Sequence, residues 1–174
     1  MSHVPYILCA AALADSMSGR ATRSIALPLA QLPATTPELL DKIRALEEFQ
    51  LSNGEPTDLP TEHLIHAGLY VRTITMPKEM VLTGALIKRA TVVIVTGSCA
   101  LLAGEEWSRL DGYNTIPASA GRKQVFVSYS PVIITTIFPT QAKTVEEAER
   151  EFTDDCDRLL SRRQDANTVR ITGE

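Results

Sequence analysis

Short apolar runs, each closed by glycine or proline, occupy the middle of the chain from residue 67 to about residue 140. β-branched residues are frequent in these runs, which is typical of strands rather than of helices. Turn residues at such close intervals predict a sandwich or a small barrel. The runs that we expect to be strands are 69–75, 81–83, 91–96, 100–103, 113–116, 125–129 and 132–138.

Helical patterns flank this region on both sides. On the N-terminal side, Thr36 suits the N-cap, Pro37 suits the first helical position, and Leu39 begins an apolar stripe at helical spacing. On the C-terminal side, Thr144 and Glu147 have the spacing of a capping box, in which each side chain satisfies a backbone donor of the other residue. The stripe that follows predicts a helix running through Val145, Ala148, Phe152, Cys156 and Leu159.

These patterns divide the chain into three parts. Residues 1–35 are expected to be an N-terminal arm, residues 36–143 a β domain with its preceding helix, and residues 144–174 a C-terminal helix and tail. The arm contains Pro28 within an apolar run, which suits an edge strand at most. After Ser161 the tail is polar, and we expect it to be mobile.

Composition narrows the function classes. The chain has 174 residues, 44% of them hydrophobic and 22% charged, as in an ordinary single globular domain. A net charge of −4 argues against a partner such as long nucleic acid, but it does not exclude a local basic pocket for one small anion. No apolar run approaches the roughly 20 residues that span a bilayer. The three cysteines have no metal-site spacing, which indicates free thiols and a cytoplasmic location.

Other polar residues have ordinary interpretations. His63 lies just before the first expected strand, and we interpret it as a surface or loop histidine. Glu105, Glu106 and Asp111 lie in a turn-rich stretch, where carboxylates are normally solvated. Trp107 lies in the same stretch and is interpreted as a packing residue of a loop.

A set of segments in the β region has a recognisable order and spacing. The segments are 66–72, 74–77, 81–84, 96–97, 116–118, 121–123 and 135–140. Together they resemble a family of cupin-like proteins of phages and prophages, mostly of unassigned function, within the RmlC-like cupin superfamily. The resemblance covers roughly residues 41–150. It implies a mainly β, cupin-like antiparallel barrel or sandwich with flanking N- and C-terminal helices.

The chain departs from that family at the metal site. The family pattern carries two histidines four residues apart after Gly84 and one more histidine before the last Pro-Thr pair. By that alignment the corresponding positions are Ile87, Thr91 and Phe138. Isoleucine and phenylalanine cannot coordinate a metal, and a neutral threonine hydroxyl alone is a poor ligand. The resemblance therefore implies a cupin without a metal site and without a cofactor.

Strand alternation then suggests what replaces the metal. If residue 87 points inward along a strand, Arg89 and Thr91 point inward as well, and a buried guanidinium must be paired or bound to an anion. In the alternative, Arg89 lies on the outer face or at a strand end, and the basic turn at residues 121–123 is a solvated hairpin. The candidate ligand-binding residues are His66, Tyr70, Arg72, Arg89, Thr91, Arg122 and Lys123. No catalytic residue is assigned.

Three functions follow from this interpretation. The first is a non-catalytic, metal-free binder of an anionic metabolite or nucleotide, and the phage resemblance suggests sequestration of a host signal in a bacterial or phage-infected cell. The second is a metal-independent cupin enzyme of the isomerase or lyase type, with His66, Tyr70 or a carboxylate as acid or base. The third is a structural or assembly scaffold. A homo-oligomer is expected in each case, with residues 1–35 and the helix at 144–160 as candidate contacts, and no membrane partner.

Overall fold

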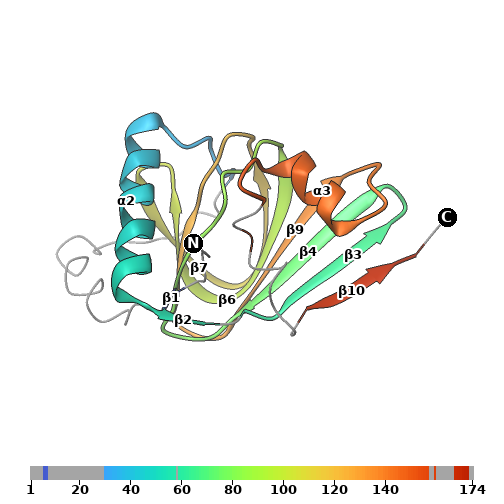
Figure 1. Cartoon of the computed structure of the whole chain (residues 1–174). Helices are drawn as coiled ribbons and strands as arrows, with labels where there is room; N and C mark the ends of the chain where they lie inside the picture. The colour runs from blue at the N-terminus through green and yellow to red at the C-terminus, as the bar shows by residue number, and fades with distance from the viewer. Residues whose placement is uncertain (1–5, 8–29, 58, 157–158, 160–166, 173–174) are drawn as a thin grey trace.

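One curled sheet dominates the computed structural model, which describes residues 6–7, 30–57, 59–156, 159 and 167–172 (Figure 1). Its eight strands have the order β10-β3-β4-β9-β6-β8-β5, and β7 pairs with β6. The strands are β3 Thr61–His66, β4 Leu69–Met76, β5 Val81–Thr83, β6 Thr91–Ala103, β7 Glu106–Ala118, β8 Val125–Ser128, β9 Val132–Pro139 and β10 Thr168–Ile171. A separate two-stranded sheet pairs β1 (Tyr6–Ile7) with β2 (Glu55–Pro56). The prediction of a mainly β, curled architecture with flanking helices is confirmed.

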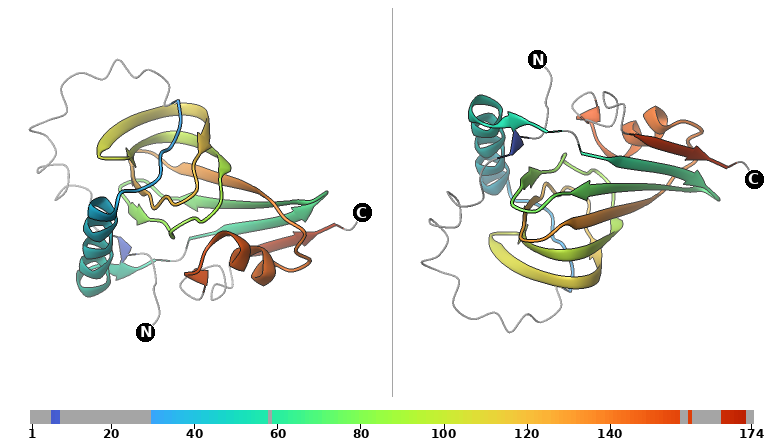
Figure 2. Two further views of the ribbon diagram at one scale, coloured as in Figure 1. Left: turned by 90° about the horizontal axis from the view of Figure 1, so that it is seen from above. Right: turned by 90° about the horizontal axis from the view of Figure 1, so that it is seen from below.

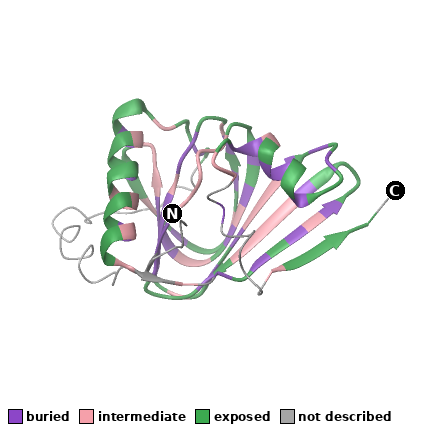
Figure 3. Ribbon diagram, in the orientation of Figure 1, coloured by how far each residue is buried: buried purple, intermediate pink, exposed green. Residues whose placement is uncertain are grey.

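The sheet is mixed rather than purely antiparallel. All its pairings are antiparallel except that of β10 with β3, which is parallel. We expected a mobile tail after Ser161, and this expectation is wrong for residues 168–171, which form β10. The strand is exposed along its length (Figure 3). Because it has no buried face, its sequence lacks the apolar alternation that predicts a strand. Residues 160–166 lie outside the described residues.

Helix α2, Pro37–Asn53, begins where the N-cap signal predicted. The Thr36 hydroxyl accepts a hydrogen bond from the backbone N–H of Leu39 at 3.3 Å. Leu39 and Ile43 then pack against Val81, Ala100, Val125 and Val127, which lie on β5, β6 and β8. The helix therefore covers the outer side of the sheet at one end of the molecule (Figure 2).

Helix α3, Val145–Phe152, carries the predicted capping box between Thr144 and Glu147. It is shorter than expected, because the chain leaves the helix at Thr153, whose hydroxyl donates to the carbonyl of Leu86 at 2.8 Å. Cys156 and Leu159 lie beyond the helix, yet both still contact the apolar cluster that the helix covers. The apolar stripe was therefore correct about burial and wrong about the length of the helix.

Strands β6 and β7 form one long hairpin, whereas the sequence predicted several shorter strands in this region. Gly97, which looked like the end of a strand, lies within β6 with a φ of +124°. A Cβ atom at this position would lie 2.4 Å from the carbonyl oxygen of Pro131, so the glycine permits a close backbone approach. The stretch from Glu106 to Asp111 belongs to β7, so its expected role as a loop is wrong.

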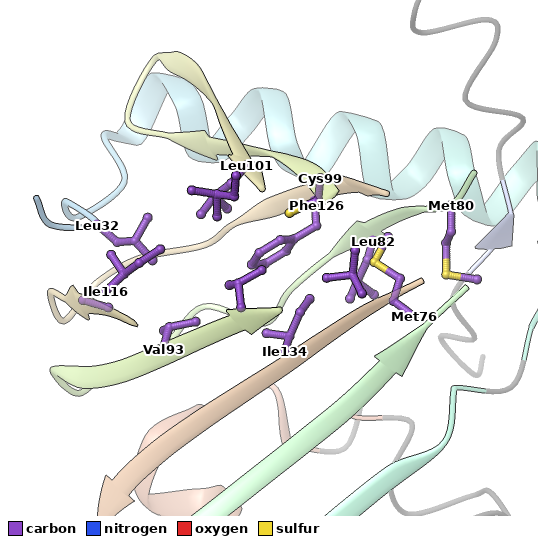
Figure 4. Packing of buried hydrophobic residues seen from close by; sticks show 14 of the residues in the cluster. Leu32, Met76, Met80, Leu82, Val93, Cys99, Leu101, Ile116, Phe126 and Ile134 are labelled. Carbon is purple, nitrogen blue, oxygen red and sulfur yellow. The ribbon is translucent and has the colours of Figure 1, made fainter. Parts of the chain in front are cut away.

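The largest apolar core lies on the inner side of the curl. Met76, Leu101, Phe126 and Ile134 point toward one another from four strands (Figure 4). Leu32 is also fully buried there and forms an isolated bridge with Ala118. The last residues of the expected arm thus pack against the sheet, while most of residues 1–35, with their expected contact to a neighbouring subunit, lies outside the described residues. The division into three parts stays a prediction.

Candidate functional site

The inner faces of four adjacent strands carry a band of polar side chains at the α3 end of the curl. His63 of β3 is the register partner of Arg72 of β4, and Arg72 is the partner of Thr136 of β9. Thr136 in turn pairs with the buried Val93 of β6, two residues from the inward-facing Thr91. We call His63, Arg72, Thr91, Thr136 and the adjoining Arg122 the polar band. It lies between the apolar core and the aromatic cluster under α3.

Arg122 is the most buried charge of the band. It lies between β7 and β8, where its backbone N–H and carbonyl bridge to Ile87. Its side chain is fully buried, with an exposed fraction of 0%. The guanidinium donates to the Thr91 hydroxyl at 2.5 Å and to the carbonyls of Ser119 and Arg89 at 2.6 and 3.0 Å. The structure therefore brings together two of the predicted ligand-binding residues, Thr91 and Arg122.

The charge of Arg122 is held by neutral oxygen atoms. Burial lowers the pKa of Arg122 to about 10, so the guanidinium still carries its charge at neutral pH. Within the described part of the chain, no carboxylate lies in ion-pair distance of it, and its Nε has no hydrogen-bond partner. Buried charges are normally paired with an opposite charge. Among the described residues, Arg122 is thus a buried cation without a carboxylate partner.

His63 and Tyr70 form a buried pair beside the band. The Nδ1 atom of His63 lies 2.7 Å from the Tyr70 hydroxyl, and the two rings are nearly parallel. Burial, and secondarily the positive charge of Arg72, lowers the pKa of His63 to about 4, against a smaller opposing effect of Glu146. The imidazole is therefore neutral at physiological pH, and its Nε2 atom is buried without a hydrogen-bond partner.

Arg72 adds a second cation on the same face. It is half-buried, and its Nε atom is also buried without a hydrogen-bond partner. The Thr136 hydroxyl donates to the Arg72 carbonyl at 3.4 Å, which places Thr136 against the same strand. The band therefore holds unpartnered nitrogen atoms on His63, Arg72 and Arg122.

An aromatic stack closes this end of the curl. The ring centroids of Phe138 and Phe152 lie 4.6 Å apart, and Tyr70 stacks on Phe152 at 5.9 Å. Phe152 comes from α3, whereas Tyr70 and Phe138 are register partners on β4 and β9. The stack packs α3 over the inner face next to the polar band.

The three positions aligned with metal ligands all lie at this end of the molecule. Phe138 is buried under α3, Ile87 packs against the same cluster, and Thr91 is buried and bonded to Arg122. The interpretation that this chain has no metal site stays a prediction. Among the described residues, no group of three histidine, cysteine or carboxylate side chains is placed to hold a metal ion.

The structure contradicts the inward orientation of Arg89. Strand β6 begins only at Thr91, and residue 87 makes an isolated bridge, so the alternation assumed across 87–91 does not hold. The Arg89 side chain is 44% exposed and forms an ion pair with Glu151 of α3 at 2.7 Å. A second ion pair, between Lys88 and Asp154 at 2.6 Å, joins the same two segments. Arg89 therefore belongs to the contact between α3 and the loop, which is the strand-end alternative.

Two further candidates lie away from the band. The Nζ atom of Lys123 is buried and bonds Glu47 of α2 at 2.6 Å and the Gly84 carbonyl at 2.7 Å, so it ties α2 to the sheet. His66 is exposed at the end of β3, where its Nδ1 lies 2.8 Å from the Thr172 hydroxyl. Of the candidate residues, the inner face thus holds Tyr70, Arg72, Thr91 and Arg122.

His63 is the residue that the sequence interpretation missed. Its exposed fraction is 1%, so the expectation of a surface or loop histidine is wrong. The signal was available, because Thr61, His63 and Ile65 alternate with Glu62, Leu64 and His66, and the first set is buried. Two histidines and a glutamate in six residues obscured this strand pattern.

A separate groove lies between α2 and the sheet. It has a volume of about 340 Å³, and Ile43, Leu102 and Trp107 contribute apolar walls with Lys42 and Glu105 among its polar lining. None of the predicted ligand-binding residues lines it. In the part of the chain that is described, no helix has the length and apolar character needed to cross a membrane.

Comparisons with known proteins give structural similarity only. No protein-family model matches the sequence, and no curated protein matches it. Among solved structures, a cupin superfamily protein from Desulfitobacterium hafniense has 8% identity and a TM-score of 0.41, over 51% of this chain and 84% of that one. A cupin-2 domain protein from Shewanella frigidimarina has 12% identity and a TM-score of 0.38, over 55% and 91%. The cupin domain of Schizosaccharomyces pombe Cnp3 has 14% identity and a TM-score of 0.40, over 63% and 78%. At these values the similarity carries no information on ligand or activity.

Proposed function

We propose that this protein is a non-catalytic binder of a small anion, which is held at the polar band by Arg122. The observation that carries the proposal is a fully buried, charged guanidinium whose described partners are a hydroxyl and two carbonyls. Removing a guanidinium from water is expensive unless an opposite charge compensates the loss of hydration. An anion from solution supplies that charge.

The ligand class follows from the donor geometry. A guanidinium presents its N–H groups in a planar fork that matches a carboxylate or a phosphate. The unpartnered Nε atoms of Arg122 and Arg72 are further N–H donors for acidic oxygens. A carboxylate-bearing metabolite or a nucleotide phosphate is the ligand that this chemistry suits. Sequestration of a host signal by a phage-encoded protein in the cytoplasm is the use that we propose for such binding.

Access to the band requires the cover at this end to open. The cover consists of α3 and the loop before β6, which are joined by the ion pairs Arg89–Glu151 and Lys88–Asp154. Exposed ion pairs contribute only about 0–1 kcal/mol each. Hydrogen bonds to backbone carbonyls join the same segments. The backbone N–H and the Nζ atom of Lys88 donate to the carbonyls of Phe152 at 2.7 Å and Arg150 at 3.2 Å, and the Thr153 hydroxyl donates to the carbonyl of Leu86 at 2.8 Å. We propose that ligand enters where these two segments separate.

The test is a binding titration with a panel of anions. Isothermal titration calorimetry of the full chain with inorganic phosphate, nucleoside monophosphates and small dicarboxylates should give saturable binding for at least one class. Arg122→Met, which keeps the aliphatic stem and removes the charge, should weaken that binding about 100-fold, because charged hydrogen bonds and the ion pair are lost together. Arg44→Met is the matched control, since Arg44 is exposed on α2, and its affinity should equal that of the unmodified chain.

Two results would contradict the proposal. One is the absence of saturable binding for every anion class of the panel. The other is unchanged affinity in Arg122→Met, which would place any anion site elsewhere. Melting curves of both variants establish that each is folded before titration.

The other predicted functions have less support. A metal-independent enzyme that uses His66, Tyr70 or a carboxylate as acid or base stays a prediction; His66 lies at the exposed end of β3 and Tyr70 on the inner face, so these two do not form one site. The scaffold function stays a prediction.

A further inference from the structure

The outer side of the central strands is a broad surface without charge. Strand alternation turns Val92, Ile94 and Thr96 of β6 outward, and their register partners on β9 are Ile137, Thr135 and Ile133. We call these six residues, with their register partners on β4 and β7, the outer face. None of the six carries a charge.

The partners on the neighbouring strands extend the same character. On β4 the partners are Val71, Thr73 and Thr75. On β7 they are Pro117, Thr115 and Tyr113. The hydroxyls of Thr73 and Thr135 lie 3.0 Å apart, which confirms that the two strands present their threonines to the same side.

Large apolar side chains of the outer face are open to solvent. The exposed fractions are 44% for Ile133 and 69% for Tyr113. At the other end of the sheet, α2 covers the outer side of Ala100, Val125 and Val127. Helix α3 packs on the inner side instead (Figure 2). Within the described residues, neither helix covers the outer face.

Charges lie at the borders of the outer face. Glu62 and Arg170, 3.6 Å apart on β3 and β10, mark one border. Arg109 and Asp111, 3.2 Å apart on β7, mark another border. A centre depleted of charge with a polar rim is the usual composition of a protein interface.

We propose that the partner of the outer face is a second copy of this chain, packed sheet against sheet. The chain has a net charge of −4, so two copies repel one another, and contact through an uncharged surface adds least to that repulsion. Threonine hydroxyls both donate and accept hydrogen bonds, so identical rows can satisfy one another across a two-fold axis. In a symmetric dimer the same surface supplies both sides of the contact, so no surface of an unrelated protein has to match it.

The area of the outer face suits such a dimer. Four strands about 4.8 Å apart and three rows about 7 Å apart span roughly 400 Å² in projection, and β3 with the charged borders adds to this. Accessible area follows the side chains and exceeds the projected area. Stable interfaces take about 600–1,000 Å² of accessible surface from each partner. Two facing sheets would lie about 10 Å apart, with Ile133 and Val92 in the layer between them.

The test is the oligomeric state of the full chain. Sedimentation velocity over about a hundredfold range of concentration should give a dimer for the unmodified chain. Ile133→Lys replaces a large exposed apolar side chain of the face by a charge and should raise the dissociation constant at least about 100-fold. Thr96→Lys adds the same charge at an exposed position of the same face and serves if Ile133→Lys fails to fold. Phe49→Lys is the matched control, because Phe49 is 52% exposed on α2 and lies outside the face, and it should remain a dimer.

Three outcomes would overturn the inference. An unmodified chain that is monomeric throughout would mean that the outer face has no second copy, including the case in which residues outside the described part of the same chain cover it. A dimer that survives both lysine substitutions on the face would place the contact elsewhere. Dissociation by Phe49→Lys to the same extent would do so as well.

Discussion

The two ends of the inner surface have opposite character although the same strands build both. At one end, Val93, Val95 and Ile134 contact one another in a core without charge. At the other end, the same alternation on the same strands turns Thr91 and Arg72 inward. Alternation within the strands is the same at both ends. For the strand residues, the difference in polarity between the two ends therefore comes from which residue types occupy the inward-facing positions.

The apolar end stabilises the fold, whereas the polar band is the region where we propose that an anion binds. The apolar end is stabilised by removal of hydrocarbon from water, at about 25 cal/mol per Å². The polar band loses stability through desolvation of Arg122 and His63, which regain only part of it through the described hydrogen bonds. Buried groups of this kind are the basis on which we propose anion binding at the polar band.

The largest effect is expected from truncation of the apolar end. Leu101→Ala removes a fully buried side chain from the core and should reduce the free energy of unfolding by about 2–5 kcal/mol. Urea unfolding monitored by circular dichroism measures the loss. Ile87→Ala, at the half-buried edge of the aromatic cluster, should cost clearly less. Equal losses at the two positions would contradict the contrast between the apolar end and the end that carries the polar band.

The next effect is a pH dependence that originates at His63. Its pKa is about 4 in the folded chain and 6.5 without burial, so between these values the unfolded chain binds a proton that the folded chain excludes. Stability is therefore full above pH 6.5 and falls as the pH decreases toward 4, by about 3 kcal/mol in total. Unfolding titrations at pH 7 and at pH 4 measure the difference.

A histidine control isolates this contribution from that of the carboxylates. His66→Gln should keep the full pH dependence, because His66 is exposed. His63→Gln should lose about 3 kcal/mol of it and leave only the carboxylate contribution. If both variants showed the same pH dependence, the assignment to His63 would be wrong.

The smallest effect is expected from Thr91→Val, which keeps the shape of the side chain and removes the acceptor of Arg122. The guanidinium loses its 2.5 Å hydrogen bond, and the free energy of unfolding should fall by about 1–3 kcal/mol. Thr168→Val, at an exposed position of β10 outside the outer face, should change it by less than about 0.5 kcal/mol. Saturation with the anion identified by calorimetry should restore part of the loss in Thr91→Val. A loss as large in Thr168→Val would show that removal of a strand hydroxyl, not the contact with Arg122, is responsible.

Much of the fold could be predicted because its signals are local. The N-cap at Thr36, the capping box at Thr144 and the β-branched runs of β4, β5, β8 and β9 all lie within the elements that they specify. The failures have local causes as well. The Thr61–His66 strand was obscured by its charged and imidazole residues, and the exposed Thr168–Ile171 strand has no buried face to reveal it.

The candidate site was only partly predictable. Tyr70, Arg72 and Thr91 follow from alternation within strands whose direction the sequence indicated. Arg89 did not, because the alternation was extended across residues that are not in a strand. Lys123 appeared to belong to a basic turn and instead pairs with Glu47, 76 positions earlier in the chain, which no spacing rule relates to it.

The amino-acid sequence by itself determined the element types, the helix starts, and the presence of side chains other than imidazole at Ile87, Thr91 and Phe138. These are properties of neighbouring residues or of residue identity. Tertiary structure alone decided that Arg122 and His63 are buried, that Arg89 is not, and that one side of the sheet is left bare. The physical reason is that burial depends on which distant segments meet: the hydroxyl that holds Arg122 lies 31 residues away, and the segment that pairs with Arg89 lies 62 residues away.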